Sequence, residues 1–122
     1  MTVKQWSLLV GEALNYDDRN SYISDMALSV LWGIPPQGGI PADRLALLGE
    51  IYDATHRSVR EIVALSGMSQ RKFADRFCIP LRTLENWCNG VNVCALYVRL
   101  LLQSALGIPI GAPAAVTTAR KI

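Results

Sequence analysis

Apolar residues recur every three or four positions along most of this chain, which is the spacing of one face of an α-helix. The segment 3–16, VKQWSLLVGEALNY, places its apolar residues on one stripe, although Gly11 weakens the helix there. The polar residues DDRN follow, and 21–32, SYISDMALSVLW, repeats the helical pattern. The pattern therefore predicts two helices before residue 33.

The segment 33–41, GIPPQGGIP, interrupts this pattern. Its three prolines and three glycines disfavour helix and strand alike. We place a domain boundary here, with residues 1–40 forming an N-terminal helical extension.

Helical spacing resumes after the boundary and continues to residue 106. The segment 42–56 forms one predicted helix, and Ser58 with Glu61 matches a capping box that starts the next. Ser69 caps a helix over 70–77, the turn Cys78-Ile79-Pro80 ends it, and further helices cover 81–88 and 95–106. The predicted fold class is therefore all-α.

The helix 81–88 has a short apolar face and a polar one. Leu84, Trp87 and Cys88 share the inner face, which directs the other residues of the helix outward. Such a helix suits the surface of any helical bundle. It also suits the major groove of DNA, where Arg reads guanine and Asn reads adenine. Periodicity alone does not separate the two interpretations.

Residues 57–107 resemble the lambda-repressor-like helix-turn-helix domains, also called the XRE or Cro-type family. The resemblance rests on the pattern SQ..FA..F.IP..TL..W..G and on the closing LLLQSALGIPI. The pattern is carried by Ser69-Gln70, Phe73-Ala74, Phe77, Ile79-Pro80, Thr83-Leu84, Trp87 and Gly90. It implies a lambda-repressor-like helix-turn-helix bundle over 41–107, with the N-terminal helical segment as an addition.

The resemblance also implies roles for individual side chains. Helix 70–77 would lie across the phosphate backbone while helix 81–88 enters the major groove. The base-reading residues would be Arg82 and Asn86 first, then Leu81 against a thymine methyl. Glu85 would accept from cytosine or, as we prefer, orient Arg82. The phosphate-contacting residues would be Gln70, Arg71, Lys72, Thr83 and Asn89; for Arg71 and Lys72 a role as solvated surface charges is an equal alternative.

Two positions depart from the family pattern. Cys78 stands in the turn where the family commonly has Gly, so it either adopts a left-handed conformation at a cost of about 1 kcal/mol or the turn differs. Cys88 and Val63 occupy the positions of a frequent Glu–Arg pair. Because both are apolar, we expect packing in place of that ion pair.

The charge is distributed unevenly along the 122 residues. Residues 1–56 hold three cations and seven anions, a net −4, whereas 57–90 hold six cations and three anions, a net +3. The net positive charge of residues 57–90 favours a polyanionic partner. We therefore expect a double-stranded-DNA-binding transcriptional regulator, a repressor acting as a homodimer on half-sites about 34 Å apart. The alternative is an antitoxin or other interaction module whose acidic N-terminal half binds a protein partner.

The inventory of reactive residues argues against an enzyme or a metal site. There is one histidine, and the three cysteines form no CxxC pair. We expect no catalytic residues, no metal and no cofactor. No apolar run reaches the roughly 18 residues that span a bilayer, so we expect no membrane association and a cytoplasmic, nucleoid-associated location of the bacterial or phage type. The helix 95–106, apolar almost all round, predicts burial and a subunit contact, and 108–122 predicts a flexible tail in which Arg120 and Lys121 are solvated.

Overall fold

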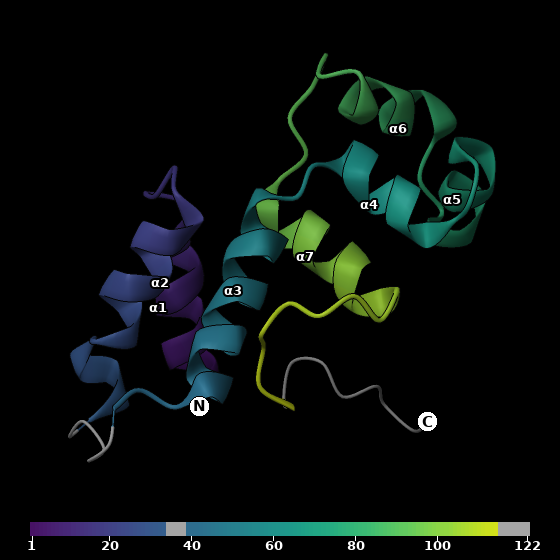
Figure 1. Cartoon of the computed structure of the whole chain (residues 1–122). Coiled ribbons are helices and arrows are strands. Elements are labelled where there is room, and N and C mark those ends of the chain that lie inside the picture. Colours follow the sequence, from purple (N-terminus) through teal and green to yellow (C-terminus); the bar gives the residue numbers. More distant parts are fainter. Residues whose placement is uncertain (34–38, 115–122) are drawn as a thin grey trace. The chain divides into compact units, whose positions relative to one another are not determined.

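The computed structural model describes residues 1–33 and 39–114, and every regular element in these two ranges is helical. This confirms the all-α prediction. The elements, shown in Figure 1, are the α-helices α1 (Val3–Ala13), α2 (Arg19–Ala27), α3 (Ala42–His56), α4 (Val59–Ser66), α5 (Gln70–Phe77), α6 (Leu81–Cys88) and α7 (Leu96–Ala105), with the 3-10 turn η1 (Val30–Trp32).

The two N-terminal helices are shorter than their apolar patterns. Helix α1 ends at Ala13, and α2 begins at Arg19 because the Asp18 carboxylate accepts a hydrogen bond from the Ser21 N–H at 2.9 Å. Helix α2 ends at Ala27, and the Ser29 hydroxyl then caps η1 by accepting from the Leu31 N–H. Side-chain caps thus divide what periodicity predicts as longer helices.

The contacts divide the chain into two compact units. Unit 1 consists of residues 1–56 and 109–122, of which 34–38 and 115–122 lie outside the described residues, and unit 2 consists of residues 57–108. The sequence prediction placed the boundary at 40 and put helix 42–56 with the DNA-binding domain. In the structure α3 packs with α1 and α2, because its apolar face buries Leu48, Ile51 and Tyr52 in the core of unit 1.

The core of unit 1 is organised around Tyr22. Its side chain is fully buried, and its hydroxyl donates to the carbonyl oxygen of Leu9 at 2.8 Å. Its ring meets Tyr16 edge-on at 5.5 Å between centroids and Tyr52 at 5.6 Å. Because the buried Tyr22 hydroxyl is hydrogen-bonded to Leu9, the aromatic cluster joins α1, α2 and α3 without leaving this polar group unsatisfied.

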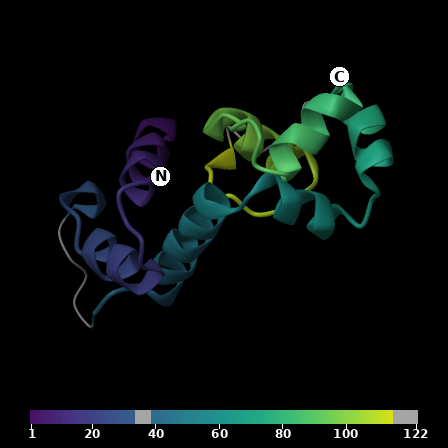
Figure 2. The same cartoon turned by 90° about the horizontal axis from the view of Figure 1, so that it is seen from above.

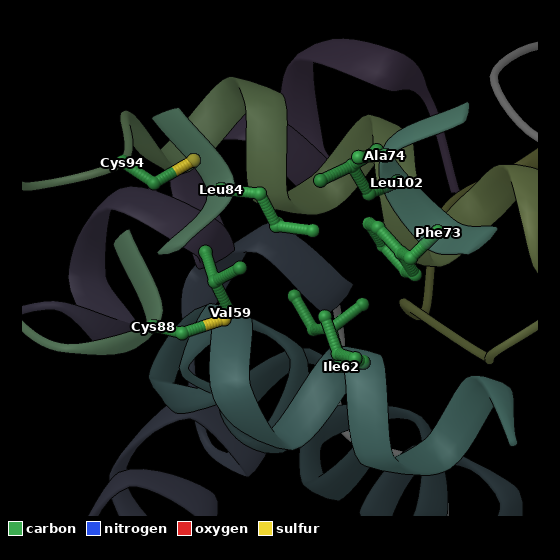
Figure 3. Close-up of a cluster of buried hydrophobic side chains, with 9 residues drawn as sticks. Val59, Ile62, Phe73, Ala74, Leu84, Cys88, Cys94 and Leu102 are labelled. Carbon is green, nitrogen blue, oxygen red and sulfur yellow. The ribbon is translucent and has the colours of Figure 1, made fainter. Parts of the chain in front are cut away.

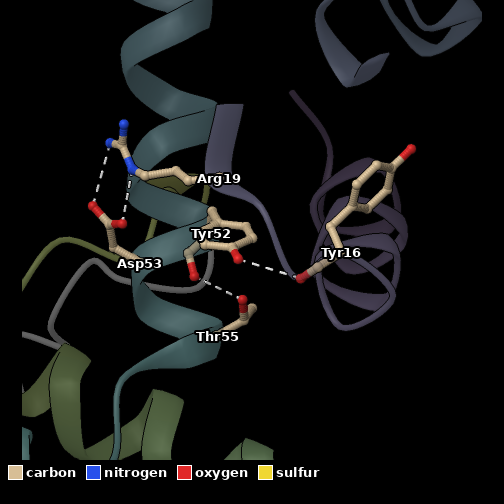
Figure 4. A network of polar contacts seen from close by, with 5 residues as sticks. All are labelled: Tyr16, Arg19, Tyr52, Asp53 and Thr55. Atoms are coloured by element: carbon tan, nitrogen blue, oxygen red, sulfur yellow. Dashed lines mark hydrogen bonds and ion pairs between the residues drawn. The ribbon is translucent and has the colours of Figure 1, made fainter. Parts of the chain in front are cut away.

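Polar contacts lie within α3 and join it to Tyr16 and Arg19, between the end of α1 and the start of α2. Figure 4 shows the Tyr52 hydroxyl donating to the carbonyl of Tyr16, and the Thr55 hydroxyl donating to the carbonyl of Tyr52. Beside them Arg19 and Asp53 form a two-pronged ion pair, with Nε to Oδ1 at 2.9 Å. Because the two side chains of this pair are 49% and 41% exposed and thus well hydrated, we attribute to it less than about 1 kcal/mol of stability.

The chain returns to unit 1 after unit 2. Trp6 Nε1 donates to the carbonyl oxygen of Ile110 at 3.1 Å, and the Ile110 side chain is only 3% exposed. Gly111, at φ +68°, lies against the side chain of Ile51 and the carbonyl oxygen of Leu47. Within the predicted tail 108–122, these residues are therefore packed. The remainder of that tail, with Arg120 and Lys121, lies outside the described residues.

Unit 2 is a small bundle in which α4, α5 and α6 pack around one another and α7 packs against α4, as Figures 1 and 2 show. The buried side chains that line its core come from every one of these helices and from the loop before α7. They are Val59, Ile62, Val63, Phe73, Ala74, Leu84, Cys88, Cys94 and Leu102, drawn as sticks in Figure 3, where all but Val63 are labelled. Val63 and Cys88 are both in this core, as expected for an apolar pair.

Candidate nucleic-acid interface

Helix α5 begins with an N-cap and three polar residues. The Ser69 hydroxyl accepts a hydrogen bond from the Lys72 N–H at 3.2 Å, as the sequence predicts. Gln70, in the first turn, is half-buried, while Arg71 and Lys72 are exposed. The positive end of a helix dipole and two exposed cations are thus presented together, an arrangement that attracts anions.

The turn between α5 and α6 contains a strained residue. Cys78 has φ 55° and ψ 36°, the left-handed conformation that we give as one of two alternatives above. In this conformation the Ile79 N–H reaches the carbonyl of Ala74 at 2.9 Å and closes the end of α5. The turn is therefore short and defined by backbone hydrogen bonds. Cys78 holds the left-handed conformation in it that glycine would adopt with less strain.

Cys78→Gly should raise the free energy of unfolding of unit 2 by up to about 1 kcal/mol. The substitution removes the left-handed strain, about 1–2 kcal/mol, and loses part of that gain to the greater freedom of glycine in the unfolded chain. Because the Cys78 side chain is exposed, little packing is lost. Urea denaturation followed by Trp87 fluorescence in a Trp6→Phe, Trp32→Phe background measures the change. Cys78→Ala, which keeps a Cβ, is the control and should not stabilise; stabilisation of equal size in both variants would show that strain is not the cause.

Helix α6 directs an apolar face inward and a polar face outward. Leu84 is fully buried and Cys88 is 7% exposed, both within the core of unit 2. The predicted base-reading residues occupy the opposite side, at positions i, i+1, i+4 and i+5 of one helix. Arg82 is exposed, Glu85 and Asn86 are partly exposed, and Leu81 is partly buried because it also packs against the core. The structure therefore brings these four residues to one face.

The predicted phosphate-contacting residues flank that face. Thr83 is partly exposed and Asn89 is exposed just after α6 ends. Glu85 and Arg82 form no ion pair in the structure, so the preferred role of Glu85, orienting Arg82, is not seen between these two described residues. The guanidinium of Arg82 extends from the helix without that restraint.

Arg60 is a contributor that sequence reasoning missed. Its Nε donates to the carbonyl oxygen of Cys88 at 3.1 Å, and its Nη2 donates to Oδ1 of Asn89 at 3.0 Å. The guanidinium thus caps the C-terminal end of α6, where a positive charge is favourable. It also orients the Asn89 amide, whose Nδ2 hydrogens stay able to donate. Arg60 lies 28 positions before Cys88 and 29 before Asn89. No local pattern spans such a separation, so the sequence carried no signal for this contact.

A second polar network closes unit 2 where the chain enters and leaves it. Arg57 Nη1 donates to Gln103 Oε1 at 2.6 Å, and Gln103 Nε2 donates to the carbonyl of Arg99 at 3.2 Å. Arg99 Nη1 in turn donates to the carbonyl of Arg57 at 2.9 Å. Gln103 is fully buried, and burial lowers the pKa of the Arg99 guanidinium. We refer to these three side chains as the neck network.

Two buried thiols and one capping carboxylate of unit 2 have pKa values that the surrounding structure shifts. Burial raises the pKa of the thiols of Cys88 and Cys94, which keeps them protonated at neutral pH. The Ser58 N–H donates to Glu61 Oε1 at 3.0 Å and the Glu61 N–H donates to the Ser58 hydroxyl at 3.1 Å, which confirms the predicted capping box; hydrogen bonds from Ser58 also lower the pKa of Glu61. Among the described residues, no three His, Cys, Asp or Glu side chains are placed to hold a metal ion.

None of the helices in residues 1–33 and 39–114 combines the length and the apolar character that crossing a membrane requires. Comparison of the chain with protein-family models, with curated proteins and with solved structures gave no match.

Proposed function

We propose that this chain is a sequence-specific double-stranded-DNA-binding transcriptional regulator, a repressor acting as a dimer, in which α6 reads the major groove. The observation that carries the proposal is the two-sidedness of α6. Leu84 and Cys88 anchor it in the core, and Arg82 with Asn86 faces outward beside it. A helix anchored in this way can enter a groove without losing its own packing.

Helix α5 supports the same proposal. It precedes α6 by the three-residue turn Cys78–Pro80 and packs against it. With α6 in the major groove, the start of α5 would meet the phosphate backbone through the half-buried Gln70 and the exposed Arg71 and Lys72. The resemblance of 57–107 to lambda-repressor-like domains leads to the same arrangement. We therefore propose that unit 2 is a helix-turn-helix bundle of that type.

The charge of unit 2 fits a polyanionic ligand. Residues 57–108 hold seven cations and three anions, a net +4, whereas residues 1–56 carry −4. A charge of this size supplies few phosphate contacts per subunit, so one copy alone would bind weakly at physiological salt. Two copies on two half-sites would combine their contacts, which is why the proposal includes a dimer.

Arg82→Ala should reduce affinity for the bound sequence by about 5- to 150-fold, equivalent to about 1–3 kcal/mol, and relax the base preference at one position. The bound sequence is first obtained by selection from a randomised duplex library at fixed salt concentration. The control is Arg76→Ala, which removes the same charge from an exposed position on α5, where the guanidinium lies over the ring of Phe77.

The control variant should weaken binding to all duplexes by a similar, smaller factor and leave the base preference intact. Equal losses in the two variants, with unchanged preference in both, would show that Arg82 contributes only charge. Failure of the wild-type chain to enrich any sequence would overturn the proposed function itself.

A second function, of another class, is favoured by a specific feature of unit 1. Leu28 is 73% exposed and Val30 is 91% exposed, two residues apart, in a unit with its own core and a negative charge. We propose as the alternative that unit 1 binds a protein partner, as an antitoxin does. Purification from the native host should then recover a stoichiometric partner with the wild-type chain, and Leu28→Ser with Val30→Ser should release it while DNA binding is retained.

A further inference from the structure

A hollow in unit 1 lies where the end of α2, the turn η1 and the start of α3 meet. Its volume is about 170 Å³, and its walls are mostly apolar. An engineered protein cavity of about 150 Å³ binds benzene, so the hollow has room for a group of about that size. The side chains that line it include those of Ala27, Leu28, Ser29, Trp32, Ile40 and Arg44.

Arg44 is the only charged residue among the described residues that line the hollow. The central carbon of its guanidinium lies over the ring of Trp32, 4.6 Å from the centroid, and Nη1 donates to the carbonyl oxygen of Ala27 at 3.3 Å. The indole is itself fixed, because Trp32 Nε1 donates to the carbonyl oxygen of Met26 at 2.8 Å. These contacts hold the cation and the ring together at the wall of the hollow.

The guanidinium of Arg44 can form more hydrogen bonds than these contacts use. A guanidinium has five N–H donors, and the bond to Ala27 occupies one of them. Within residues 1–33 and 39–114, no carboxylate lies within ion-pair distance of Arg44. The side chain is half-buried, and arginine stays charged at every physiological pH. Such a cation beside an apolar hollow favours a ligand that carries a negative charge.

A second hollow that also contacts Trp32 and Arg44 is less suited to an anion. Asp43 is among the residues that line it, and Oδ1 of Asp43 accepts from the backbone N–H of Arg44 at 3.0 Å. That carboxylate would repel a bound anion. Because no Asp or Glu is among the described residues that line the first hollow, we assign the ligand to it and call it the Arg44 pocket.

We propose that the Arg44 pocket binds a small monocarboxylic acid with an aromatic or branched aliphatic body. The carboxylate would pair with the guanidinium, which suits two parallel hydrogen bonds, while the body fills the apolar part of the pocket. A phosphate or a dicarboxylate would place further charge against apolar walls, which is unfavourable. The ligand would bind to unit 1 whether or not unit 2 binds DNA.

Benzoate is the probe for the full chain labelled with ¹⁵N, and nuclear magnetic resonance follows the indole N–H signals of its three tryptophans. Benzoate should shift the Trp32 signal saturably, with a dissociation constant on the order of 1 mM, because so small a ligand makes few contacts. The Trp6 and Trp87 signals should not move, because neither residue lines the pocket. Benzamide, which has the same size and no charge, should bind at least about tenfold more weakly.

Two sets of variants test the contacts. Arg44→Gln should weaken benzoate binding at least about tenfold and remove the difference between benzoate and benzamide. The other set keeps Arg44: Leu28 lines the pocket, whereas Val30, two residues later and also exposed, does not. Leu28→Asp should weaken benzoate binding at least about fivefold by repulsion, and the matched control Val30→Asp should change it by less than about twofold. The dispersion of the spectra verifies the fold of each variant.

The C-terminus of a peptide offers the same chemistry as a small acid, so 4-methylpentanoate is compared with N-acetylleucine. The two share an aliphatic body and a carboxylate, and N-acetylleucine adds an acetamido group. The free acid should bind more tightly, because a pocket of about 170 Å³ has little room for that group. N-acetylleucine that binds at least as tightly would overturn the assignment to a small acid.

Three further results would overturn the proposal. They are a Trp32 signal that does not shift saturably up to about 30 mM benzoate, benzamide that binds as tightly as benzoate, and equal effects of Leu28→Asp and Val30→Asp. The duplex selection separates this inference from the proposed function. Benzoate binding without an enriched DNA sequence would support the pocket and overturn the function, and an enriched sequence without benzoate binding would do the reverse.

Discussion

Phe73→Ala should lower the free energy of unfolding of unit 2 by about 3–5 kcal/mol, the largest loss that we expect from a single substitution. Phe73 is fully buried in the core of unit 2, where its ring lies 4.8 Å from that of Phe77 between centroids. Its truncation removes a large apolar surface and leaves a cavity bounded by side chains of other helices, which cannot all move inward. Because a small unit has only about 5 kcal/mol to lose, most of unit 2 should be unfolded at 37 °C.

The three tryptophans allow the effect to be localised. Trp87 lies in unit 2, whereas Trp6 and Trp32 lie in unit 1. In a Trp6→Phe, Trp32→Phe background, Trp87 fluorescence during urea denaturation reports unit 2 alone. The control is Phe77→Ala, one helical turn later in α5, where the ring is only partly buried; about 1–2 kcal/mol is expected there. Equal losses at the two positions would contradict the assignment of Phe73 to the centre of the core.

Gly111→Ala should destabilise unit 1 by about 2–4 kcal/mol, the second-largest effect. At φ +68° any residue with a Cβ is strained, and here that Cβ would collide with the side chain of Ile51 and approach the carbonyl oxygen of Leu47 to 3.1 Å. The backbone carbonyl belongs to α3 and cannot move without disturbing that helix. The segment 109–111 should therefore detach, and with it the hydrogen bond from Trp6 to Ile110.

Gly107→Ala is the matched control for this substitution. Gly107 has φ +76°, but a Cβ there would meet nothing within 4 Å, so only the strain of about 1–2 kcal/mol applies. Trp6 fluorescence in a Trp32→Phe, Trp87→Phe background measures the exposure of the indole directly. A Gly111→Ala chain with Trp6 as shielded as in the wild type, and no less stable than Gly107→Ala, would show that 109–111 does not dock on unit 1.

Local signals in the sequence predicted the helices of unit 2 closely. The bounds of 70–77 and 81–88 follow from Ser69 and Pro80, and the start of α4 follows from Ser58 with Glu61. The inward orientation of Leu84 and Cys88 follows from helical periodicity, which also placed Arg82 and Asn86 on the outer face. These features depend on residues a few positions apart, so the sequence contains their cause.

Contacts between distant residues were not predictable in this way. Trp6 and Ile110 are 104 positions apart, and Arg57 and Gln103 are 46 apart. Nothing in the apolar pattern of 42–56 indicates whether it packs with the helices before it or after it. The sequence prediction grouped it with the helices after it, whereas the contacts group α3 with α1 and α2. In the sequence Arg60 contributes only to the net charge. Its hydrogen bonds to Cys88 and Asn89 depend on how α4 and α6 pack together, which no local pattern specifies.

The return of the chain to unit 1 has a mechanical consequence. When a force pulls residue 1 away from residue 114, the load enters and leaves through unit 1, whose two segments are joined by the contacts of Trp6 and Gly111. As long as those contacts hold, tension bypasses the inserted residues 57–108. Once they break, the neck network is the first part of unit 2 to carry the tension, because it holds Arg57 to Gln103 and Arg99. Tension thus reaches α5 and α6 last. The helices that we propose to bind DNA are therefore protected from a force applied along the chain until the other contacts have broken.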